Sequence, residues 1–343
     1  MAGKASPAMK MADIAEQLGI STVAVSLALR GSPQVSKELR SRVARIAAEH
    51  GFRTRRYPQR RGSSAAGTLQ GRIAVVKGSY FSDSDPVAAL IRSSVLQRLN
   101  ERKVPFEVVP FERLEAEPAL LDDCRGILSD YSCKPEQCRL FAGHPHASVM
   151  NEELGIGPWD LYKANDLQAG ELAAEYLIGR GFAQTLLVYG EPMSFRPETN
   201  PRLQGFRNRM KTEGIPVTEL RCDYAESSGS VTGRFKAVLD RFGNRLGIFA
   251  FNDLLAYRIC LTLDFLGLVR RPGELEIISC DNTFLLKGFN PPVPEVDLHI
   301  QEIASRAVDG LLWRIENPSA CAADLLVRPG LVVAGEEQES YNS

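Results

Sequence analysis

The chain has 343 residues, of which 44% are hydrophobic and 24% are charged, and its formal net charge at pH 7 is −1. This is the composition of an ordinary globular protein with enough apolar residues for a core, and the length favours two or three domains. No apolar run reaches the roughly 18 residues that cross a membrane, and the N-terminal MAGKASPAMK has no apolar signal-peptide core, so we expect a cytoplasmic protein with no membrane partner.

Three short helices are predicted between Lys10 and Phe52. Apolar residues recur at helical spacing from Met11 to Leu18, and Gly19 follows where a residue tolerant of positive φ is favoured. Ser21 and Ser36 can cap the second and third helices. The expected inward faces of these two helices are Val25, Ala28 and Leu29, and Leu39, Val43, Ile46 and Ala47. This order is typical of a helix-turn-helix module, whose second helix enters the DNA major groove.

A small surface bundle of helices would show the same pattern, but charge favours DNA binding. Residues 1–62 hold 12 Lys and Arg against 4 Asp and Glu, whereas the remainder holds 29 against 38. A basic module attracts phosphates, and an acidic body does not. The second helix also exposes small or apolar side chains that suit base edges and thymine methyl groups, namely Thr22, Val23, Ala24 and Leu27.

The run from MADIAEQLGIS to IAAEHGF resembles the DNA-binding domain of the LacI/GalR family of bacterial transcription regulators. The motifs that match are "DIA", "GIS", "VS", "GSPQVS" and the "IA.E.GF" ending of the third helix. The resemblance implies base contacts from Thr22, Val23 and Leu27 and phosphate contacts from Ser21 and Ser26. We also assign Ala24, Arg30, Arg55 and Arg56 to the DNA interface. The resemblance also implies a homodimer that binds a near-palindromic double-stranded operator. Residues 8–53 are the expected DNA-binding domain.

Residues 54–70 form a basic linker rich in arginine and small residues. In the family this segment becomes a short hinge helix on the operator and inserts a leucine into the minor groove. Here Thr54 and Arg55 replace the usual proline and asparagine, Pro58 interrupts the expected helix, and the first leucine is Leu69. Three alternatives stay open: a disordered, solvated connector, a proline wedge, or arginine contacts to phosphates and a narrow minor groove.

From Gly71 the sequence alternates between strands and helices, which predicts parallel sheets of the doubly wound α/β type. Expected strands include 71–79, 104–111, 125–130, 147–153, 184–191, 247–253, 275–282 and 325–335; expected helices include 86–100, 167–181 and 202–214. Residues 71–338 are long enough for two lobes with a ligand between them, at the carboxyl ends of the strands.

This body resembles the family's effector domain, which has the fold of periplasmic sugar-binding proteins; the motif CDNT…NPPVPEV is the most diagnostic. The resemblance assigns Arg202 to effector hydroxyls or carboxylates and Asp281 to hydroxyls, and it assigns the pair Asn252 and Asp253 to the site. Asp166 fits the end of the fourth strand or its loop, and Phe81 could supply an aromatic platform. We therefore expect a small-molecule effector, most plausibly a sugar or sugar derivative, that closes the two lobes.

The sequence gives little support for a disulfide framework, a metal site or an enzyme. Seven scattered cysteines do not form a disulfide framework and suit a reducing cytoplasm. His144 and His146 flank a proline near Cys138, but their spacing does not suit a zinc site, so we expect a turn and no metal. No GxSxG, HExxH, P-loop or GxGxxG motif indicates an enzyme or a bound cofactor. The alternatives are a sugar-binding receptor without regulatory DNA binding and, less favoured, a carbohydrate hydrolase or kinase.

Overall fold

The computed structural model describes residues 11–29, 36, 39, 41–43, 46, 71–78, 85–155, 157–190, 196–223, 226–243 and 245–333. The chain divides into two compact units, Met1–Gly67 and Thr68–Ser343. Within the described ranges, every helix is too short or too polar to span a lipid bilayer.

The first unit contains α1 (Met11–Leu18) and α2 (Thr22–Leu29), and a third helical segment includes Ser41–Val43. Gly19 has a φ of +64°, which lets the chain turn sharply between α1 and α2. Both predicted caps are confirmed: Ser21 Oγ accepts from the Ala24 N–H over 3.2 Å, and Ser36 Oγ accepts from the Leu39 N–H over 3.1 Å. The core of this unit contains Ile14, Ala15, Val25, Ala28, Val43 and Ile46. The Leu29 and Ala47 side chains lie outside the described residues.

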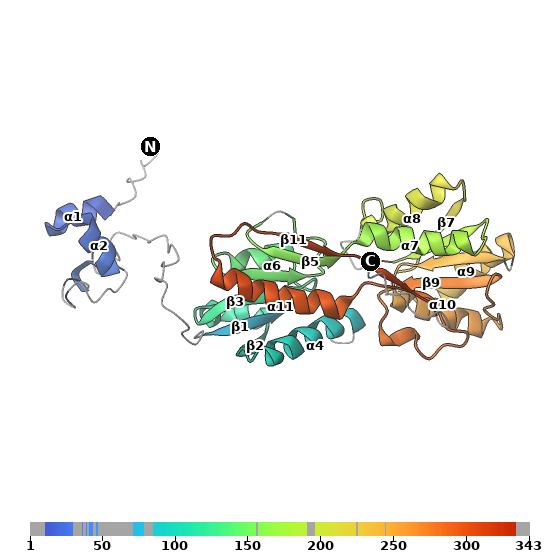
Figure 1. The fold of residues 1–343 in the computed structure, drawn as a ribbon, viewed down its shortest axis with the longest axis horizontal. Helices are drawn as coiled ribbons and strands as arrows, with labels where there is room; N and C mark the ends of the chain where they lie inside the picture. The colour runs from blue at the N-terminus through green and yellow to red at the C-terminus, as the bar shows by residue number, and fades with distance from the viewer. Residues whose placement is uncertain are drawn as a thin grey trace, which may run out of the picture. The chain divides into compact units, whose positions relative to one another are not determined.

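The second unit is built on two six-stranded sheets, each flanked by helices to make one lobe (Figure 1). In the first lobe all strand pairs are parallel, in the order β11-β5-β4-β3-β1-β2. Its strands are β1 (Arg72–Lys77), β2 (Phe106–Pro110), β3 (Cys124–Asp130), β4 (His146–Val149), β5 (Asp160–Ala164) and β11 (Asp324–Val327). Its helices are α4 (Pro86–Glu101), α5 (Phe111–Ala116), η1 (Pro118–Leu121), α6 (Pro135–Cys138), η2 (Arg139–Phe141) and α11 (Ile300–Glu316).

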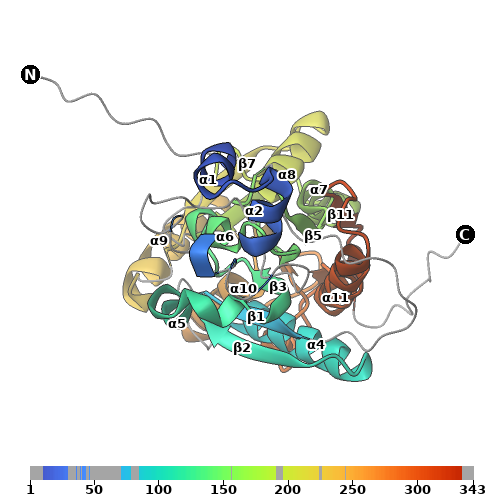
Figure 2. The ribbon, with the colours of Figure 1, turned by 90° about the vertical axis from the view of Figure 1, so that its left-hand side faces the viewer.

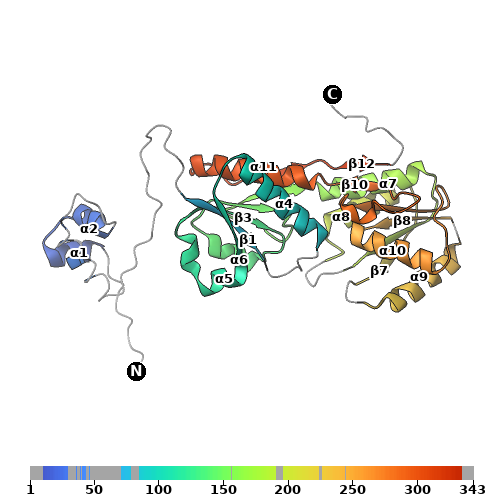
Figure 3. The same cartoon turned by 90° about the horizontal axis from the view of Figure 1, so that it is seen from below.

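The two faces of the first sheet are covered by different helices, with α4 and α11 on one side and α5 and α6 on the other (Figures 2 and 3). Alternate residues of β1 supply the two cores, as the period of a strand requires. Ile73 and Val75 belong to the core that includes α4 and α11, while Ala74 and Val76 pack with Phe111 and its neighbours.

The second lobe has the strand order β12-β10-β9-β8-β6-β7; of its described strand pairs, β10 and β12 are antiparallel and the others are parallel. Its strands are β6 (Thr185–Tyr189), β7 (Val217–Arg221), β8 (Leu246–Ala250), β9 (Leu275–Cys280), β10 (Glu295–Asp297) and β12 (Gly330–Val332). Its helices are α7 (Asp166–Gly179), α8 (Pro201–Thr212), α9 (Ser228–Phe242), α10 (Asp253–Phe265) and η3 (Phe284–Leu286). Helices α7 and α8 cover one face, and α9 and α10 cover the other (Figure 1).

The chain passes between the lobes three times. It crosses from β5 to α7 at Asn165, from β10 to α11 at His299, and from β11 to β12 between Val327 and Gly330. The first and third crossings are hydrogen-bonded to each other, since the Asn165 N–H donates to the Val327 carbonyl over 2.8 Å. Three adjacent connections of this kind can act as a hinge between two rigid lobes.

Two sequence predictions are wrong in detail. The segment 325–335 was expected to be one strand, but it forms β11 in the first sheet and β12 in the second. Pro329 lies between them and has no N–H to continue a ladder. The turn expected around His144 and His146 ends at Pro145, because His146 begins β4.

Candidate functional site

Arg202 is the centre of a buried polar cluster at the carboxyl ends of the strands. Its Nε donates to Asp166 Oδ1 over 2.7 Å, and its Nη1 donates to Asp281 Oδ1 over 3.3 Å. Nη1 also donates to the Phe251 carbonyl over 2.7 Å, and the guanidinium lies 4.6 Å from the Phe251 ring centroid. The structure therefore brings together the three predicted residues Arg202, Asp166 and Asp281, with Arg202 only 5% exposed.

Asparagine caps position these residues at the starts of their helices. Asn165 Oδ1 accepts from the Gln168 N–H and begins α7, so Asp166 is the first residue of that helix. The prediction placed Asp166 at the end of a strand or in the following loop; it lies two residues after β5 ends, as the first residue of α7. Asn200 Oδ1 accepts from the Leu203 N–H in the same way and fixes the first turn of α8 around Arg202. Each cap satisfies a free N–H at a helix start and thereby sets where the next side chain emerges.

Asp281 follows β9 with a φ of +107°, a conformation that L residues rarely adopt. Its N–H donates to the Val296 carbonyl over 3.1 Å, which holds the strained residue in place. Backbone strain of this kind occurs where the surrounding structure demands one side-chain direction. At Asp281 that direction is toward Arg202.

Burial and charge act against each other in this cluster. Burial works to lower the Arg202 pKa, but the Asp166 and Asp281 carboxylates outweigh it and raise the pKa, so the guanidinium stays charged. Burial raises the pKa of Asp281 well above its usual range although Arg202 opposes this shift. One cation thus faces two carboxyl groups in a largely buried site.

The first lobe contributes Tyr131 and Asp85, which the sequence did not single out. Tyr131 follows β3, and its hydroxyl donates to Asp85 Oδ1 over 2.5 Å, while Asp85 also caps α4. Burial raises the Tyr131 pKa, and Asp85 and Asp281 raise it further, which keeps the phenol protonated. Tyr131 and Asp85 thus belong to the first lobe, whereas Arg202 and Asp281 belong to the second.

Asn252 and Asp253 have local structural partners. Asn252 Oδ1 accepts from the Leu255 N–H and caps α10. Asp253 is fully buried, with Oδ1 accepting from Ser279 Oγ over 2.8 Å and Oδ2 from the Thr283 N–H over 2.6 Å. Because both of its carboxylate oxygens are bonded within the lobe, Asp253 is not among the ligand contacts that we propose.

The structure describes only some of the residues that are predicted to contact DNA. Ser21 and Thr22 are exposed at the start of α2, and Ala24 is half-buried. The side chains of Val23, Ser26 and Leu27 lie outside the described residues, as do Arg30, Arg55, Arg56 and, in the body, Phe81.

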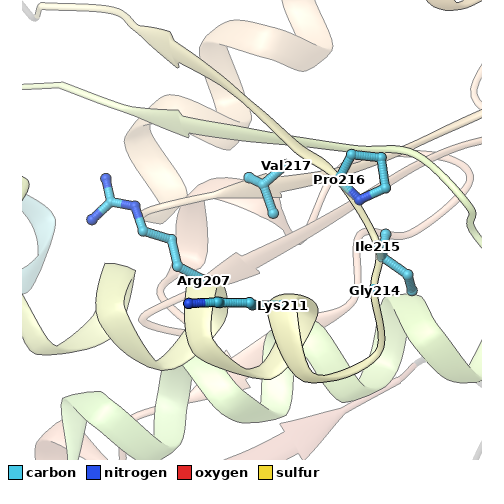
Figure 4. A pocket seen from close by; sticks show the side chains of 6 residues that line it. All are labelled: Arg207, Lys211, Gly214, Ile215, Pro216 and Val217. Atoms are coloured by element: carbon cyan, nitrogen blue, oxygen red, sulfur yellow. The ribbon is translucent and has the colours of Figure 1, made fainter.

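Two other features of the second unit, a hollow and a pair of histidines, lie apart from the Arg202 cluster. A hollow of about 350 Å³ is lined by α8 and the approach to β7, and none of the predicted effector residues lines it (Figure 4). His146 is buried, with Nε2 2.8 Å from Ser129 Oγ, and His144 Nε2 lies 2.9 Å from the Leu121 carbonyl oxygen. Among the described residues, no three potential ligands are arranged to hold a metal ion.

Comparison with known families gives two matches. Residues 10–55 match the family described as bacterial regulatory proteins, lacI family, and residues 174–335 match a periplasmic binding protein-like domain.

Two bacterial regulators are similar to this chain in sequence. DegA, an HTH-type transcriptional regulator of Bacillus subtilis (strain 168), is 23% identical over 312 residues, which cover 85% of this chain and 87% of DegA. The ribose operon repressor of Escherichia coli (strain K12) is 28% identical over 184 residues, which cover 52% of this chain and 54% of the repressor.

Solved structures show the same fold. A complex of the transcriptional regulator CelR with cellobiose has a TM-score of 0.64 at 22% identity and covers 95% of this chain and 98% of its own. The Lac repressor dimer bound to operator and the anti-inducer ONPF has a TM-score of 0.62 at 19% identity, with the same coverage. The chain thus carries a DNA-binding domain of the lacI family of bacterial regulatory proteins at residues 10–55, joined to a periplasmic binding protein-like domain, which is the domain organisation of a LacI-family transcriptional regulator.

Proposed function

We propose that this regulator binds a near-palindromic operator as a homodimer and that a neutral sugar or sugar derivative, held at Arg202, Asp166 and Asp281, controls its operator affinity. The observation that carries the proposal is the Arg202 cluster itself. It lies at the carboxyl ends of the strands, where open α/β sheets bind their ligands. The repressors and regulators to which the chain is similar include proteins named for ribose and solved with cellobiose.

The chemistry of the cluster suits hydroxyl groups. Carboxylate oxygens of Asp166 and Asp281 accept hydrogen bonds, and the planar fork of Arg202 donates them, so a pair of neighbouring hydroxyls finds both kinds of partner. Two carboxyl groups against one guanidinium disfavour a phosphate or a carboxylate ligand. We therefore propose a neutral ligand.

Control of DNA binding follows from the two-lobed architecture. Tyr131 and Asp85 belong to the first lobe, whereas Arg202 and Asp281 belong to the second. A ligand that contacts both lobes favours one hinge angle over others. It changes operator affinity through a coupling free energy that is typically about 1–3 kcal/mol.

On the operator, α2 would lie in the major groove. Thr22, Val23 and Leu27 would contact bases, and Ser21 and Ser26 would contact phosphates. The exposure of Ser21 and Thr22 supports this orientation. The basic residues Arg30, Arg55 and Arg56 would add phosphate or minor-groove contacts.

Exposed apolar side chains on the second lobe support the homodimer. Phe265 on α10 is 80% exposed and Phe284 on η3 is 73% exposed, and Leu261 lies one turn before Phe265. The two elements pack on each other. Large exposed aromatic side chains are typical of protein interfaces, and we propose that a second copy of the chain covers them.

A thermal-shift measurement with D-ribose, cellobiose and glucose 6-phosphate tests the ligand class. We expect at least one neutral sugar to raise the unfolding midpoint, because binding to the folded state adds about 2.7 kcal/mol at a hundredfold excess over Kd. Glucose 6-phosphate should give no shift. In Arg202→Ala the shift should vanish, while Arg207→Ala keeps it, since Arg207 lies on the same helix but pairs with Glu219 at the surface. An equal shift in Arg202→Ala would refute the proposed site.

A further inference from the structure

Helices α7 and α8 pack against each other (Figure 1). At Gly170 and Gly205 the two backbones lie closer than any residue with a Cβ would allow. A Cβ added to Gly170 of α7 would lie 1.9 Å from the carbonyl oxygen of Arg202 and 2.7 Å from the Phe206 nitrogen. A Cβ added to Gly205 of α8 would lie 2.0 Å from the carbonyl oxygen of Leu167. Both obstacles are backbone atoms, which cannot rotate away.

The contacts are reciprocal, and they fall on the segments that carry the charged pair. Gly170 touches the backbone of Arg202 itself, and Gly205 touches the residue that follows Asp166. The ion pair between Arg202 and Asp166 joins the first turns of the same two helices, with a distance of 2.7 Å between Nε and Oδ1. The glycine contacts therefore set the separation at which this pair forms.

We infer that Gly170 and Gly205 are positioning residues of the effector site: their close contact holds the Arg202 guanidinium against Asp166. This inference rests on the proposed function for its biological meaning, although the geometry does not depend on any ligand. Cβ atoms essentially never approach within 3.0 Å of another atom, so alanine at either position pushes the helices apart by about 1 Å. A charge-assisted hydrogen bond of about 2.7–2.9 Å does not survive such a displacement.

A third glycine of the same helix provides a matched control. Gly179 lies near the end of α7, and no atom lies within 4 Å of a Cβ added there. Alanine at Gly179 changes the chain in the same chemical way without separating the helices.

The test is a double-mutant cycle on the stability of the full-length protein, with Arg202→Met and Asp166→Asn as the two arms. Unfolding by urea is measured for the two single variants and the double variant. The cycle is run in three backgrounds: the natural sequence, Gly170→Ala and Gly179→Ala. The coupling between the two arms reports whether the pair is in contact, and a general loss of packing at α7 does not change it.

In the natural and Gly179→Ala backgrounds we expect a coupling of at least about fivefold in the unfolding equilibrium constant, because contacting charged pairs couple by this much or more. In Gly170→Ala the coupling should fall to about onefold. Unchanged coupling in Gly170→Ala would overturn the inference, and so would the absence of coupling in the natural background.

A second variant covers the case in which Gly170→Ala does not fold. Gly205→Ala meets a different carbonyl of the same crossing and should also abolish the coupling. If neither variant folds while Gly179→Ala does, the glycines are requirements of the fold, and the positioning role is wrong. Loss of coupling as expected, together with an unchanged sugar response in Arg202→Ala, would refute the proposed function and leave the positioning inference standing.

Discussion

Arg202 and Phe251 are joined twice, once through the backbone and once through the ring. Nη1 of Arg202 donates to the Phe251 carbonyl over 2.7 Å, and its guanidinium lies 4.6 Å from the centroid of the Phe251 ring. The end of β8 thus holds the cation from one side while Asp166 and Asp281 hold it from others. A cation fixed in this way is prepared to donate to a ligand without reorganising.

Replacing the Phe251 ring separates these two contacts. Phe251→Leu keeps the carbonyl and removes the cation–π interaction, so we expect a loss of about 0.5–2 kcal/mol in unfolding free energy and in sugar affinity. Phe251→Tyr keeps an aromatic face and should retain both. Urea unfolding and isothermal titration with the bound sugar check this, and equal affinities of Phe251→Leu and the natural protein would contradict it.

Glu295 should make stability depend on pH. This residue is 3% exposed on β10, and burial, with Asp253 nearby, raises its pKa from 4.5 to about 7. Between these values the folded state binds more protons than the unfolded state, so stability falls as pH rises through the window and is constant above it. We expect a loss of about 1–3 kcal/mol across this window, and the pairing of Lys287 with the ionised form already limits the pKa shift.

Glu295→Gln provides the control for this pH dependence. His146, whose pKa burial lowers to about 3, contributes the opposite trend in both proteins. The informative quantity is therefore the difference in unfolding free energy between the natural protein and Glu295→Gln from pH 5 to pH 8. A difference that does not change with pH would contradict the assignment.

The turn before α2 depends on Gly19. Its φ is +64° and no atom lies within 4 Å of an added Cβ, so substitution strains only the backbone. Gly19→Ala should destabilise the DNA-binding module by about 1 kcal/mol or more, and Gly19→Asn by less because asparagine tolerates this conformation. Affinity for a selected operator, measured by fluorescence anisotropy over a range of temperatures, should fall first in Gly19→Ala. Equal behaviour of the two variants would show that the turn does not limit binding.

The exposed Phe265 on α10 predicts how the dimer can be broken. A buried charge at an apolar interface is costly, so Phe265→Asp should shift the protein toward monomer and weaken operator binding. Leu140→Asp, at a 59% exposed position on η2 in the other lobe, is the control. Analytical ultracentrifugation distinguishes the outcomes, and an unchanged sedimentation coefficient in Phe265→Asp would exclude this face as the dimer contact.

Local elements could be predicted from the sequence because their signals are local. The caps Ser21 and Ser36, the turn at Gly19 and the strand around β1 follow from residue type and spacing, and the structure has them. The assignment of strands to lobes could not be predicted, because β5, β11 and β12 join sheets according to where the chain crosses between lobes. The pattern of apolar residues along a strand is the same in either sheet, so it does not show which sheet the strand joins.

The candidate site was likewise predicted in part. Arg202 and Asp281 were proposed because their motifs resemble those of a known family, and Asp166 because of its expected place at a strand end or in the following loop; the structure places all three together. Tyr131 and the Phe251 carbonyl were missed, since their roles depend on tertiary contacts that no spacing reveals. The cap Asn200 before Arg202 was a usable signal, because Asn followed by Pro marks a helix start.

The most direct test measures operator affinity by fluorescence anisotropy with and without the sugar found by thermal shift, for the natural protein and for Arg202→Ala. We expect the sugar to change the operator affinity of the natural protein by about fivefold or more, whereas Arg202→Ala should bind the operator without responding to the sugar. An Arg202→Ala variant whose operator affinity still responds to the sugar as the natural protein does would contradict the account.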